Sequence, residues 1–481
     1  MPIPDELGWP TAMLLGLLVV QVILSGAVLL RPQRRQASSL AWILVILLLP
    51  VIGITLWFLF GEVRMGRARK ERHGIIQAEL RERMKPFWAQ QKEALLTHMD
   101  QPLAHLGWAV CRTDPRPGNL MRLVPDSEDV IQGMIDDIDR AQRTVHILTY
   151  IWLEDSAGQS MAKAVARAAR RGVACRILAD ALGARDMLGG KLQALMEAAG
   201  AKVMPALEPP FPPVLTGRID MRNHRKITIV DNESAWVGSQ NIADADFAPK
   251  RAHAPWIDCM LRMQGPAVTD LEQLFCEDWQ LDAGEAIQPA VGVPCPAPDG
   301  VIAQIMGTGP NSENGALVQI LQAMIHMARE EVILTTPYFV PDEGTLAALC
   351  TAARRDISVR LILPSAGDSF LVAAASRSFY EPLLDAGVEI HEFVGGLLHA
   401  KTMTVDRRLA HVGSANIDRR SFEINFEVST LVYDSDFASH LRLLQQTYLD
   451  RCEPIKAAAW ASRSRLRRLG QNAAGILSPL L

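Results

Sequence analysis

The chain has 481 residues, enough for two or three ordinary domains with a large buried core. Its 49 Lys and Arg residues nearly balance its 53 Asp and Glu residues, and the formal net charge of −4 argues against a nucleic-acid partner. Hydrophobic residues make up 49% of the chain, which is ordinary for a globular protein, so the slightly positive mean hydropathy must have a local source.

That source is a pair of long uncharged segments at the N-terminus. Residues 11–30 and 40–60 are rich in Leu, Val and Ile, and each is about as long as the 20 residues that a helix needs to cross a bilayer. Trp42 and Trp57, near the ends of the second segment, suit the headgroup region. A cleavable signal peptide fits poorly, because the first ten residues carry acidic but no basic side chains. We therefore expect residues 1–62 to form a transmembrane helical hairpin, with a pair of buried core helices as the alternative.

Charged and reactive side chains near these segments bear on orientation. Three Arg residues lie between the two segments, five basic residues follow the second one, and the N-terminal tail has none. This balance slightly favours a cytoplasmic main domain. The scattered Cys residues form no C-x-x-C pair, which agrees with a reducing compartment. The C-terminal tail, residues 453–481, is basic and then apolar, and we expect it to contact the membrane rather than to be a frayed end.

The middle of the chain contains an internal sequence repeat. Residues 63–110 are charged and helix-prone, and we expect a helical connector there. Beyond it, residues 168–178 (AARRGVACRIL) match residues 352–362 (AARRDISVRLI) without a gap. Helix-period segments alternate with short Val/Ile/Leu strands around both copies. This pattern predicts an α/β fold with two pseudo-twofold-related lobes, residues 111–295 and 296–452, each with a mixed sheet flanked by helices.

Each predicted lobe contains His-x-Lys-x-x-x-x-Asp followed by Gly-Ser-x-Asn. The residues are His224, Lys226, Asp231, Ser239 and Asn241 in the first copy, and His399, Lys401, Asp406, Ser414 and Asn416 in the second. In both copies the Gly lies 14 residues after the His. Average composition gives roughly 0.03 accidental copies of the first motif per chain, so the duplication is meaningful.

The spacing of His and Lys predicts an anion site. Two residues apart on a strand, they share one face, and Arg225 between them should face the other way. Pseudo-symmetry then brings two imidazoles and two ammonium groups around one point, an arrangement that suits a phosphodiester. The Asn and Ser side chains of the Gly-Ser-x-Asn motifs are expected to donate to the same phosphate oxygens. The candidate phosphate ligands are Lys226, Lys401, Asn241, Asn416, Ser239 and Ser414.

A nucleophilic His also needs its second ring nitrogen held by a carboxylate. Asp231 and Asp406 belong to the candidate catalytic set by motif, but their odd spacing from the His turns them away, so we expect them to hold turns or contacts between lobes. Asp258 and Glu427 follow the Gly-Ser-x-Asn motifs in strand-like runs. We predict that these two acids orient the histidines.

Metal ligation is the main alternative for a cluster of His and Asp. The sequence has no H-E-x-x-H, no Cys/His zinc spacing and no carboxylate-rich loop, and the Lys of each motif would repel a cation. We therefore expect neither a metal nor another cofactor.

The duplicated motif resembles that of the phospholipase D superfamily, and four further segments make the chain similar to bacterial cardiolipin synthases of the A type. These segments are 61–63 (GEV), 336–341 (TPYFVP), 395–401 (GGLLHAK) and 420–427 (RSFEINFE). The resemblance runs essentially from end to end. It implies a multi-pass enzyme of the bacterial inner membrane that converts two phosphatidylglycerol molecules into cardiolipin and glycerol. It also implies a phosphohistidine on His224, with His399 as acid and base.

Other functions remain open at this point. A phospholipase D-type hydrolase would use the same residues, with water resolving the intermediate, and a phosphatidylserine synthase would use another acceptor. A nuclease would need a basic groove and no lipid anchor. The expected partners are phosphatidylglycerol and cardiolipin in the bilayer, without nucleic acid, and the sequence leaves the oligomeric state open.

Overall fold

The computed structural model describes residues 8–30, 36–60, 67–89, 94–208, 220–289, 296–312 and 315–476. The chain forms two compact units. One unit comprises residues 1–67 and 209–220, and the other comprises residues 68–208 and 221–481. We call them the N-terminal unit and the catalytic unit.

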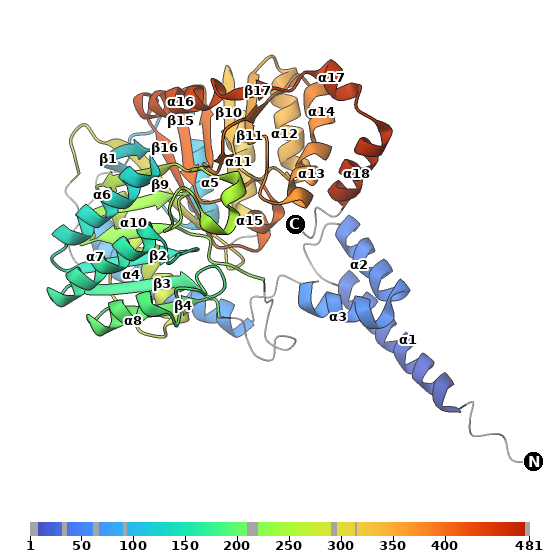
Figure 1. The fold of residues 1–481 in the computed structure, drawn as a ribbon, viewed down its shortest axis with the longest axis horizontal. Helices are drawn as coiled ribbons and strands as arrows, with labels where there is room; N and C mark the ends of the chain where they lie inside the picture. Colours follow the sequence, from blue (N-terminus) through green and yellow to red (C-terminus); the bar gives the residue numbers. More distant parts are fainter. Residues whose placement is uncertain are drawn as a thin grey trace, which may run out of the picture. The chain divides into compact units, whose positions relative to one another are not determined.

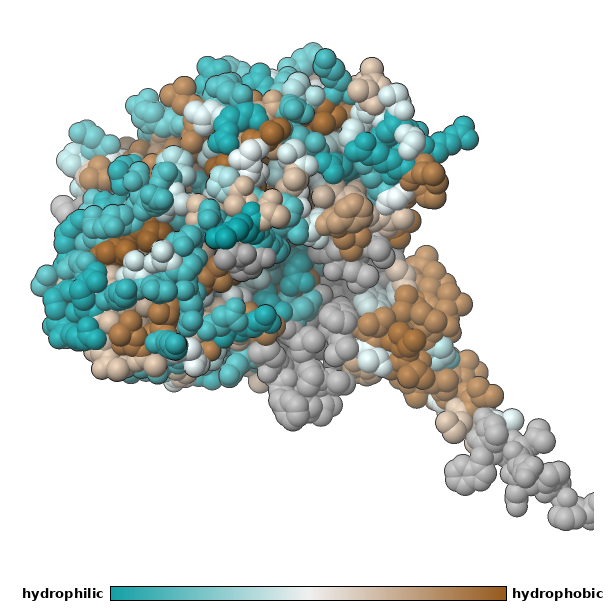
Figure 2. Space-filling model, in the orientation of Figure 1, coloured by the Kyte–Doolittle hydropathy of each residue, from teal (hydrophilic) through white to brown (hydrophobic). Residues whose placement is uncertain are grey.

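The N-terminal unit is helical and apolar. Its helices are α1 (Gly8–Leu29), α2 (Gln36–Leu48) and α3 (Pro50–Phe60). Figure 2 shows brown, hydrophobic residues over most of the surface of these helices. Among the described residues, one stretch, Thr11–Leu29 in α1, is long and apolar enough to cross a membrane. The residues expected to link the two spans, 31–35, lie outside the described residues.

The second expected span, residues 40–60, is not one continuous helix, which corrects the sequence-based prediction. The break between α2 and α3 falls at Pro50, whose nitrogen has no hydrogen to donate to the carbonyl of Ile46 four residues earlier. The side chain of Gln21, from α1, takes over this role, because its Nε2 donates to Ile46 O at 2.7 Å. The apolar segment thus turns sharply between two helices, and the carbonyl left free at the turn is satisfied by a neighbouring helix.

The expected connector contains two helices, separated in its described part by the irregular residues 94–100, and it packs on the catalytic unit. Its helices are α4 (Arg67–Trp88) and α5 (Gln101–Cys111). Arg69 of α4 forms an ion pair with Asp282, and the His73 ring lies 3.7 Å from Glu277. Asp282 and Glu277 both lie on helix α10 (Ala267–Asp282), so α4 is fastened along that helix.

One continuous sheet runs through the catalytic unit (Figure 1). The strands of the first half are β1 (Arg116–Val124), β2 (Thr144–Thr149), β3 (Ala174–Asp180), β4 (Lys202–Ala206), β5 (Ile227–Val230), β6 (Ser234–Gly238) and β8 (Met260–Gln264). Those of the second half are β9 (Val301–Thr308), β10 (Glu331–Thr335), β11 (Ser358–Pro364), β12 (Glu389–Phe393), β14 (Thr402–Val405), β15 (Leu409–Gly413), β16 (Glu427–Tyr433) and β17 (Cys452–Pro454).

The strand order makes the expected pseudo-symmetry explicit. The order is β17-β12-β11-β10-β14-β15-β16-β9-β1-β8-β6-β5-β2-β3-β4. Apart from β17, the second half is the first half reversed, with matching parallel and antiparallel pairings, and the antiparallel pair β1–β9 lies at the centre. The predicted lobes are therefore halves of one compact unit rather than separate domains. Their predicted boundary, near residues 295–296, falls at the edge of a segment outside the described residues.

Helices cover both faces of this sheet. Those of the first half are α6 (Ser127–Arg140), α7 (Ser156–Arg170), α8 (Lys191–Ala198), the 3₁₀ helix η2 (Ala248–His253) and α10. Those of the second half are α11 (Ala316–Met327), α12 (Glu343–Arg354), α13 (Phe370–Ser378), α14 (Tyr380–Asp385), α15 (Arg419–Glu423), α16 (Ser435–Leu449), α17 (Ala457–Ala461) and α18 (Arg465–Ile476).

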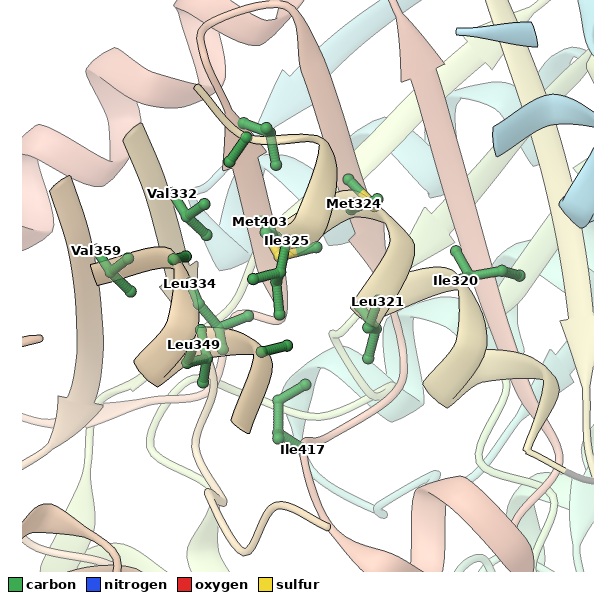
Figure 3. Close-up of a cluster of buried hydrophobic side chains, with 14 of the residues drawn as sticks. Ile320, Leu321, Met324, Ile325, Val332, Leu334, Leu349, Val359, Met403 and Ile417 are labelled. Carbon is green, nitrogen blue, oxygen red and sulfur yellow. The ribbon is translucent and has the colours of Figure 1, made fainter. Parts of the chain in front are cut away.

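Side chains that alternate along a strand divide the core in two. Val332 and Leu334 of β10 pack with Leu321 of α11 and Leu349 of α12, as Figure 3 shows. Ile333, between them, points into the cluster that contains residues of α10 and α16.

The two copies of the duplicated sequence also share a local feature, because in both copies the helix is followed by a residue in the left-handed conformation. These left-handed residues are Gly172 after α7, with φ of 89°, and Asp356 after α12, with φ of 61°. Each follows its helix by two residues and leads directly into the next strand. The two halves thus reach equivalent strands, β3 and β11, by the same turn.

Candidate active site

The two motif histidines lie just before strands β5 and β14, where the halves of the catalytic unit meet. Sequence analysis placed His and Lys within a strand, but the regular strands begin only at Ile227 and Thr402. The backbone ahead of them pairs with the opposite half instead. His224 N donates to Phe426 O at 2.9 Å, and His399 N donates to Ile257 O at 2.7 Å. A short parallel sheet, β7 (Trp256–Ile257) with β13 (Leu397–Leu398), forms part of this exchange.

The same exchange carries an acid from each half to the histidine of the other. His224 Nδ1 lies 3.0 Å from Glu427 Oε2, and His399 Nδ1 lies 2.6 Å from Asp258 Oδ1. Sequence analysis selected both acids but did not reveal that they cross between the halves. Each imidazole is thereby held at Nδ1 by a carboxylate from the opposite lobe, and its Nε2 can face a substrate.

Burial keeps both imidazoles neutral in the empty site. Desolvation is the main cause that lowers the pKa of His224 to about 4, with Glu427 opposing and Lys226 and Lys401 adding to the shift. Desolvation likewise lowers the pKa of His399 to about 4, again against its carboxylate partner. A neutral ring that donates from Nδ1 to a carboxylate presents an Nε2 lone pair, which is the form a nucleophile needs.

The orienting acids stay ionised. Burial alone would raise the pKa of Asp258, but His399, Lys401 and Ser239 together lower it to about 2. Burial would also raise the pKa of Glu427, which His224, Lys226 and Ser414 hold below its usual value.

The two motif serines correct a sequence-based prediction. They were expected to donate to phosphate, but Ser239 Oγ donates to Asp258 Oδ1 at 2.6 Å and Ser414 Oγ donates to Glu427 Oε2. Each hydroxyl also accepts a backbone N–H, from Cys259 and Val428 respectively. The serines therefore position the carboxylates that position the histidines, and their protons are not free for a ligand.

The two lysines are buried cations close to both histidines. Lys226 Nζ donates to His224 O, and Lys401 Nζ donates to His399 O, both at 2.6 Å. Desolvation lowers the pKa of Lys226 to about 7 and that of Lys401 to about 8, and the mutual repulsion of the lysines contributes to the lowered value at Lys226. An anion between them would relieve both effects.

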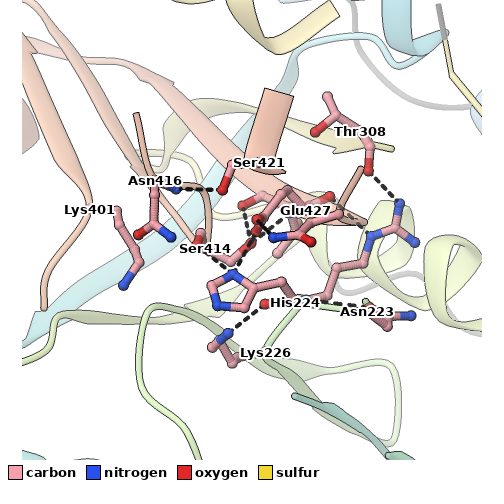
Figure 4. A network of polar contacts seen from close by, with 12 residues as sticks. Asn223, His224, Lys226, Thr308, Lys401, Ser414, Asn416, Ser421 and Glu427 are labelled. Carbon is pink, nitrogen blue, oxygen red and sulfur yellow. Dashed lines mark hydrogen bonds and ion pairs between the residues drawn. The ribbon is translucent and has the colours of Figure 1, made fainter. Parts of the chain in front are cut away.

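Asn241 and Asn416 also lie in the site without a partner. Their side chains are 5% and 4% exposed, and within the described part of the chain neither Oδ1 has a hydrogen-bond partner. Figure 4 shows the amide of Asn416 beside Lys401 and His224. Buried amide oxygens without partners are uncommon in proteins, and the amide of Asn416 lies beside a buried cation, Lys401. The two buried ammonium groups can bind an anionic ligand, and the free amide oxygens can accept a hydrogen bond from a donor such as a ligand hydroxyl.

Asp231 and Asp406 lie at the far ends of β5 and β14 from the histidines, so their place in the candidate catalytic set is corrected. The Asp231 carboxylate accepts backbone N–H bonds from Gln142, Arg143 and Thr144 at 2.7–2.8 Å. The Asp406 carboxylate does the same with residues 329–331, which precede β10. Both aspartates hold the turn that begins the neighbouring strand, which is the structural role that their odd spacing suggested.

Arg225 turns away from the lysines, as expected, and joins the halves. Its guanidinium donates to Asp278 in the first half and to the carbonyls of Thr308 and Glu427 in the second. The arginine is 2% exposed, so these bonds are made in the interior.

Two aromatic residues at the site were missed by the sequence analysis. The Tyr150 ring lies 4.8 Å from the His224 ring, and the Trp256 ring lies 4.6 Å from the His399 ring, measured between centroids. The sequence contained a signal for both residues. Tyr150 directly follows β2, and Trp256 shares a strand face with Asp258, which lies two residues later. Each ring forms an apolar wall against one imidazole.

The chain is similar to known proteins over most of its length. A family profile described as "Cardiolipin synthase, PLD-like domain" matches residues 134–279 and 321–446, and one described as "Phospholipase_D-nuclease N-terminal" matches residues 14–62. The chain is 34% identical over 474 residues to cardiolipin synthase A of Klebsiella pneumoniae and to that of Yersinia pestis, covering 96% of each chain. The crystal structure of phosphatidylserine synthase from Haemophilus influenzae has the same fold, with a TM-score of 0.60 and 12% identity over 80% of this chain and 100% of that one.

Proposed function

This chain belongs to the cardiolipin synthase family of phospholipase D-like proteins, and from that premise we propose that it joins two phosphatidylglycerol molecules through a phosphohistidine. It is a phosphatidyltransferase of phospholipid biosynthesis that acts on membrane lipids and is associated with the membrane. The observation that carries the proposed chemistry is the crossed arrangement of two neutral, carboxylate-held imidazoles beside two buried ammonium groups.

In the first half-reaction, Nε2 of His224 attacks the phosphorus of one phosphatidylglycerol. The bond from phosphorus to the glycerol oxygen breaks, and His399, protonated at Nε2 in the substrate complex, gives its proton to the departing oxygen. A phosphatidyl group stays bound to His224, glycerol leaves, and His399 is left neutral. The negative charge of the bound phosphate favours the protonated form of His399, against the burial that lowers its pKa in the empty site.

In the second half-reaction, His399 takes the proton from a hydroxyl of a second phosphatidylglycerol. That oxygen attacks the phosphorus, the bond between phosphorus and nitrogen breaks, and His224 returns to its neutral form as cardiolipin leaves. Lys226 and Lys401, with the amides of Asn241 and Asn416, bind the non-bridging oxygens on which charge accumulates. The depressed pKa values of the lysines support their part in this role, because an anion would stabilise both ammonium groups.

We also propose that the apolar N-terminal unit anchors the enzyme as a hairpin in the bacterial inner membrane, with the catalytic unit on the cytoplasmic side. Support comes from α1 and from the contact of Gln21 with the carbonyl of Ile46, which lets α2 and α3 tolerate their break in an apolar medium. An anchor of this kind keeps the site beside both lipid substrates.

The test is turnover of phosphatidylglycerol labelled at its phosphorus, in mixed micelles with the purified full chain. We expect cardiolipin and glycerol from the wild-type enzyme. Phosphatidic acid without cardiolipin would establish hydrolysis instead. In single turnovers quenched with alkaline detergent, His399→Ala should retain protein-bound label that later acid treatment releases, and His224→Ala should retain none, whereas the opposite pattern would exchange the roles of the two histidines.

A further inference from the structure

An exposed apolar surface lies on two packed helices of the catalytic unit, α13 and α18. Ala375 of α13 and Ala474 of α18 are buried in one cluster, and an added Cβ at Gly475 would come within 2.5 Å of Ser378 Oγ, so the helices approach closely. Figure 1 shows them side by side near the C-terminus. This pair of helices is therefore a single surface rather than a detached tail.

The outward side of α18 is apolar where a helix in water would be polar. Leu466, Leu469 and Ile476 are 81%, 66% and 78% exposed, and their spacing of three and seven residues places them on one stripe. Phe370, the first residue of α13, is 88% exposed. Large apolar side chains gathered in this way mark a surface that is covered in the working state.

Basic residues border the stripe. Arg465 and Arg467 are exposed, and within the described part of the chain neither has an acidic partner, whereas the neighbouring Arg463 and Arg468 pair with Glu381. An amphipathic surface with an apolar stripe and unpaired arginines is complementary to a bilayer that contains anionic lipids.

The surface is connected to the active site through Asp368, which precedes α13. Asp368, two residues before Phe370, forms an ion pair with Lys250 of the first half and accepts a hydrogen bond from Tyr338 at 2.7 Å. Its charge is also felt at His399 and Lys401, so this carboxylate lies in the electrostatic neighbourhood of the reaction. The start of α13 thus joins the exposed apolar surface to the site.

We infer that α13 and α18 form an interfacial docking surface, defined by Phe370, Leu466, Leu469 and Ile476 with Arg465 and Arg467, which seats the catalytic unit on an anionic bilayer with its active site facing the lipids. The inference rests on the proposed function for its purpose, since docking shortens the path of phosphatidylglycerol from the bilayer to the histidines. It adds a second membrane contact to that of the apolar N-terminal helices.

The first test measures docking without turnover. A spin label on Leu469→Cys in the full chain, reconstituted in nanodiscs of phosphatidylglycerol and phosphatidylcholine, should be relaxed more by oxygen than by a water-soluble nickel complex. A label on Leu443→Cys is the matched control, because Leu443 is 64% exposed on α16, away from this surface. The unsubstituted chain, treated with the same label, gives the background from native cysteines. Equal nickel access at both positions, or immobilisation of the Leu469 label by a second copy of the chain, would overturn the inference.

The second test separates docking from chemistry. Phe370→Ser and Leu469→Ser should each lower the rate of cardiolipin formation in vesicles about fivefold, since each removes part of an apolar contact, and leave the rate in detergent micelles unchanged. Leu443→Ser should change neither rate. Loss in both assays, or wild-type rates in vesicles, would contradict the inference. A wild-type enzyme that forms no cardiolipin in micelles would refute the proposed function, while the spin-label result would still decide the docking.

Discussion

Replacing Asp258 by Asn should lower activity more than replacing Glu427 by Gln, because the two histidines differ in the number of acceptors around Nδ1. His399 Nδ1 contacts Asp258 at 2.6 Å. His224 Nδ1 contacts both Glu427 and the carbonyl of Ser414, each at 3.0 Å. After Glu427→Gln the carbonyl still holds the proton on Nδ1, whereas after Asp258→Asn the new amide can donate to Nδ1 and move the proton to Nε2.

The two losses follow from these contacts. A hydrogen bond to a charged group contributes about 1.5–3 kcal/mol, so Glu427→Gln should lower kcat roughly 10- to 150-fold. The wrong imidazole tautomer costs about 10⁴-fold in a serine protease triad, so Asp258→Asn should lower kcat roughly 10³- to 10⁴-fold.

The assay is the initial rate of cardiolipin formation from labelled phosphatidylglycerol in mixed micelles. Asp231→Asn is the matched control, since Asp231 is also a buried aspartate but bonds backbone at the far end of β5. Its kcat should stay within about threefold of wild type, and thermal unfolding should confirm that each variant is folded. Equal losses for Asp258→Asn and Glu427→Gln, or a larger loss for Glu427→Gln, would refute the reasoning about acceptors.

Four further predictions concern the lysine charges, a turn and an amide. Because burial lowers the pKa of Lys226 to about 7 and that of Lys401 to about 8, kcat/KM should fall as pH rises above about 7, and Lys226→Arg should move this fall to higher pH; a flat profile to pH 10 would contradict this. The folded-state pKa lies below the ordinary 10.5, so the free energy of unfolding of the ligand-free enzyme should instead rise from pH 7 to 10, as melting temperatures would show. Asp406→Ala removes the acceptor of three backbone N–H groups and should lower the free energy of unfolding by about 2–4 kcal/mol in denaturant titrations, with little change in kcat of the folded fraction. Asn416→Ala should lower kcat about 100-fold without lowering the melting temperature, because its Oδ1 has no partner in the described structure; a strong loss of stability would argue against a ligand role.

Much of this architecture was readable from the sequence because it is duplicated. The match between residues 168–178 and 352–362 encodes the same helix, left-handed turn and strand twice, and the strand order repeats it on a larger scale. The duplicated motif likewise predicted that each histidine would lie near the lysine of the other copy, and the charge of that lysine lowers the pKa of each histidine. Local pattern suffices where the controlling contacts are local.

The remainder depends on contacts that no local spacing encodes. Asp258 and Glu427 were selected as orienting acids, but their exchange between halves depends on the pairing of β7 with β13 and of His224 with Phe426, across more than a hundred residues. A serine hydroxyl suits a phosphate or a carboxylate equally well, so the sequence could not assign Ser239. Pro50, by contrast, lies inside the second apolar segment, and a proline within a helix removes a backbone N–H donor. The sequence alone therefore predicts the break between α2 and α3.

The exchange of acids means that neither half of the catalytic unit possesses a working reaction centre. A fragment that ends between the repeats would keep His224 but also Asp258, which contacts the missing His399. We expect such a fragment to be inactive even if it folds. On the proposed mechanism, damage to either repeat would impair both the nucleophile and the proton carrier. Neither copy can therefore be lost or altered independently, because each histidine depends on a carboxylate that the other copy supplies.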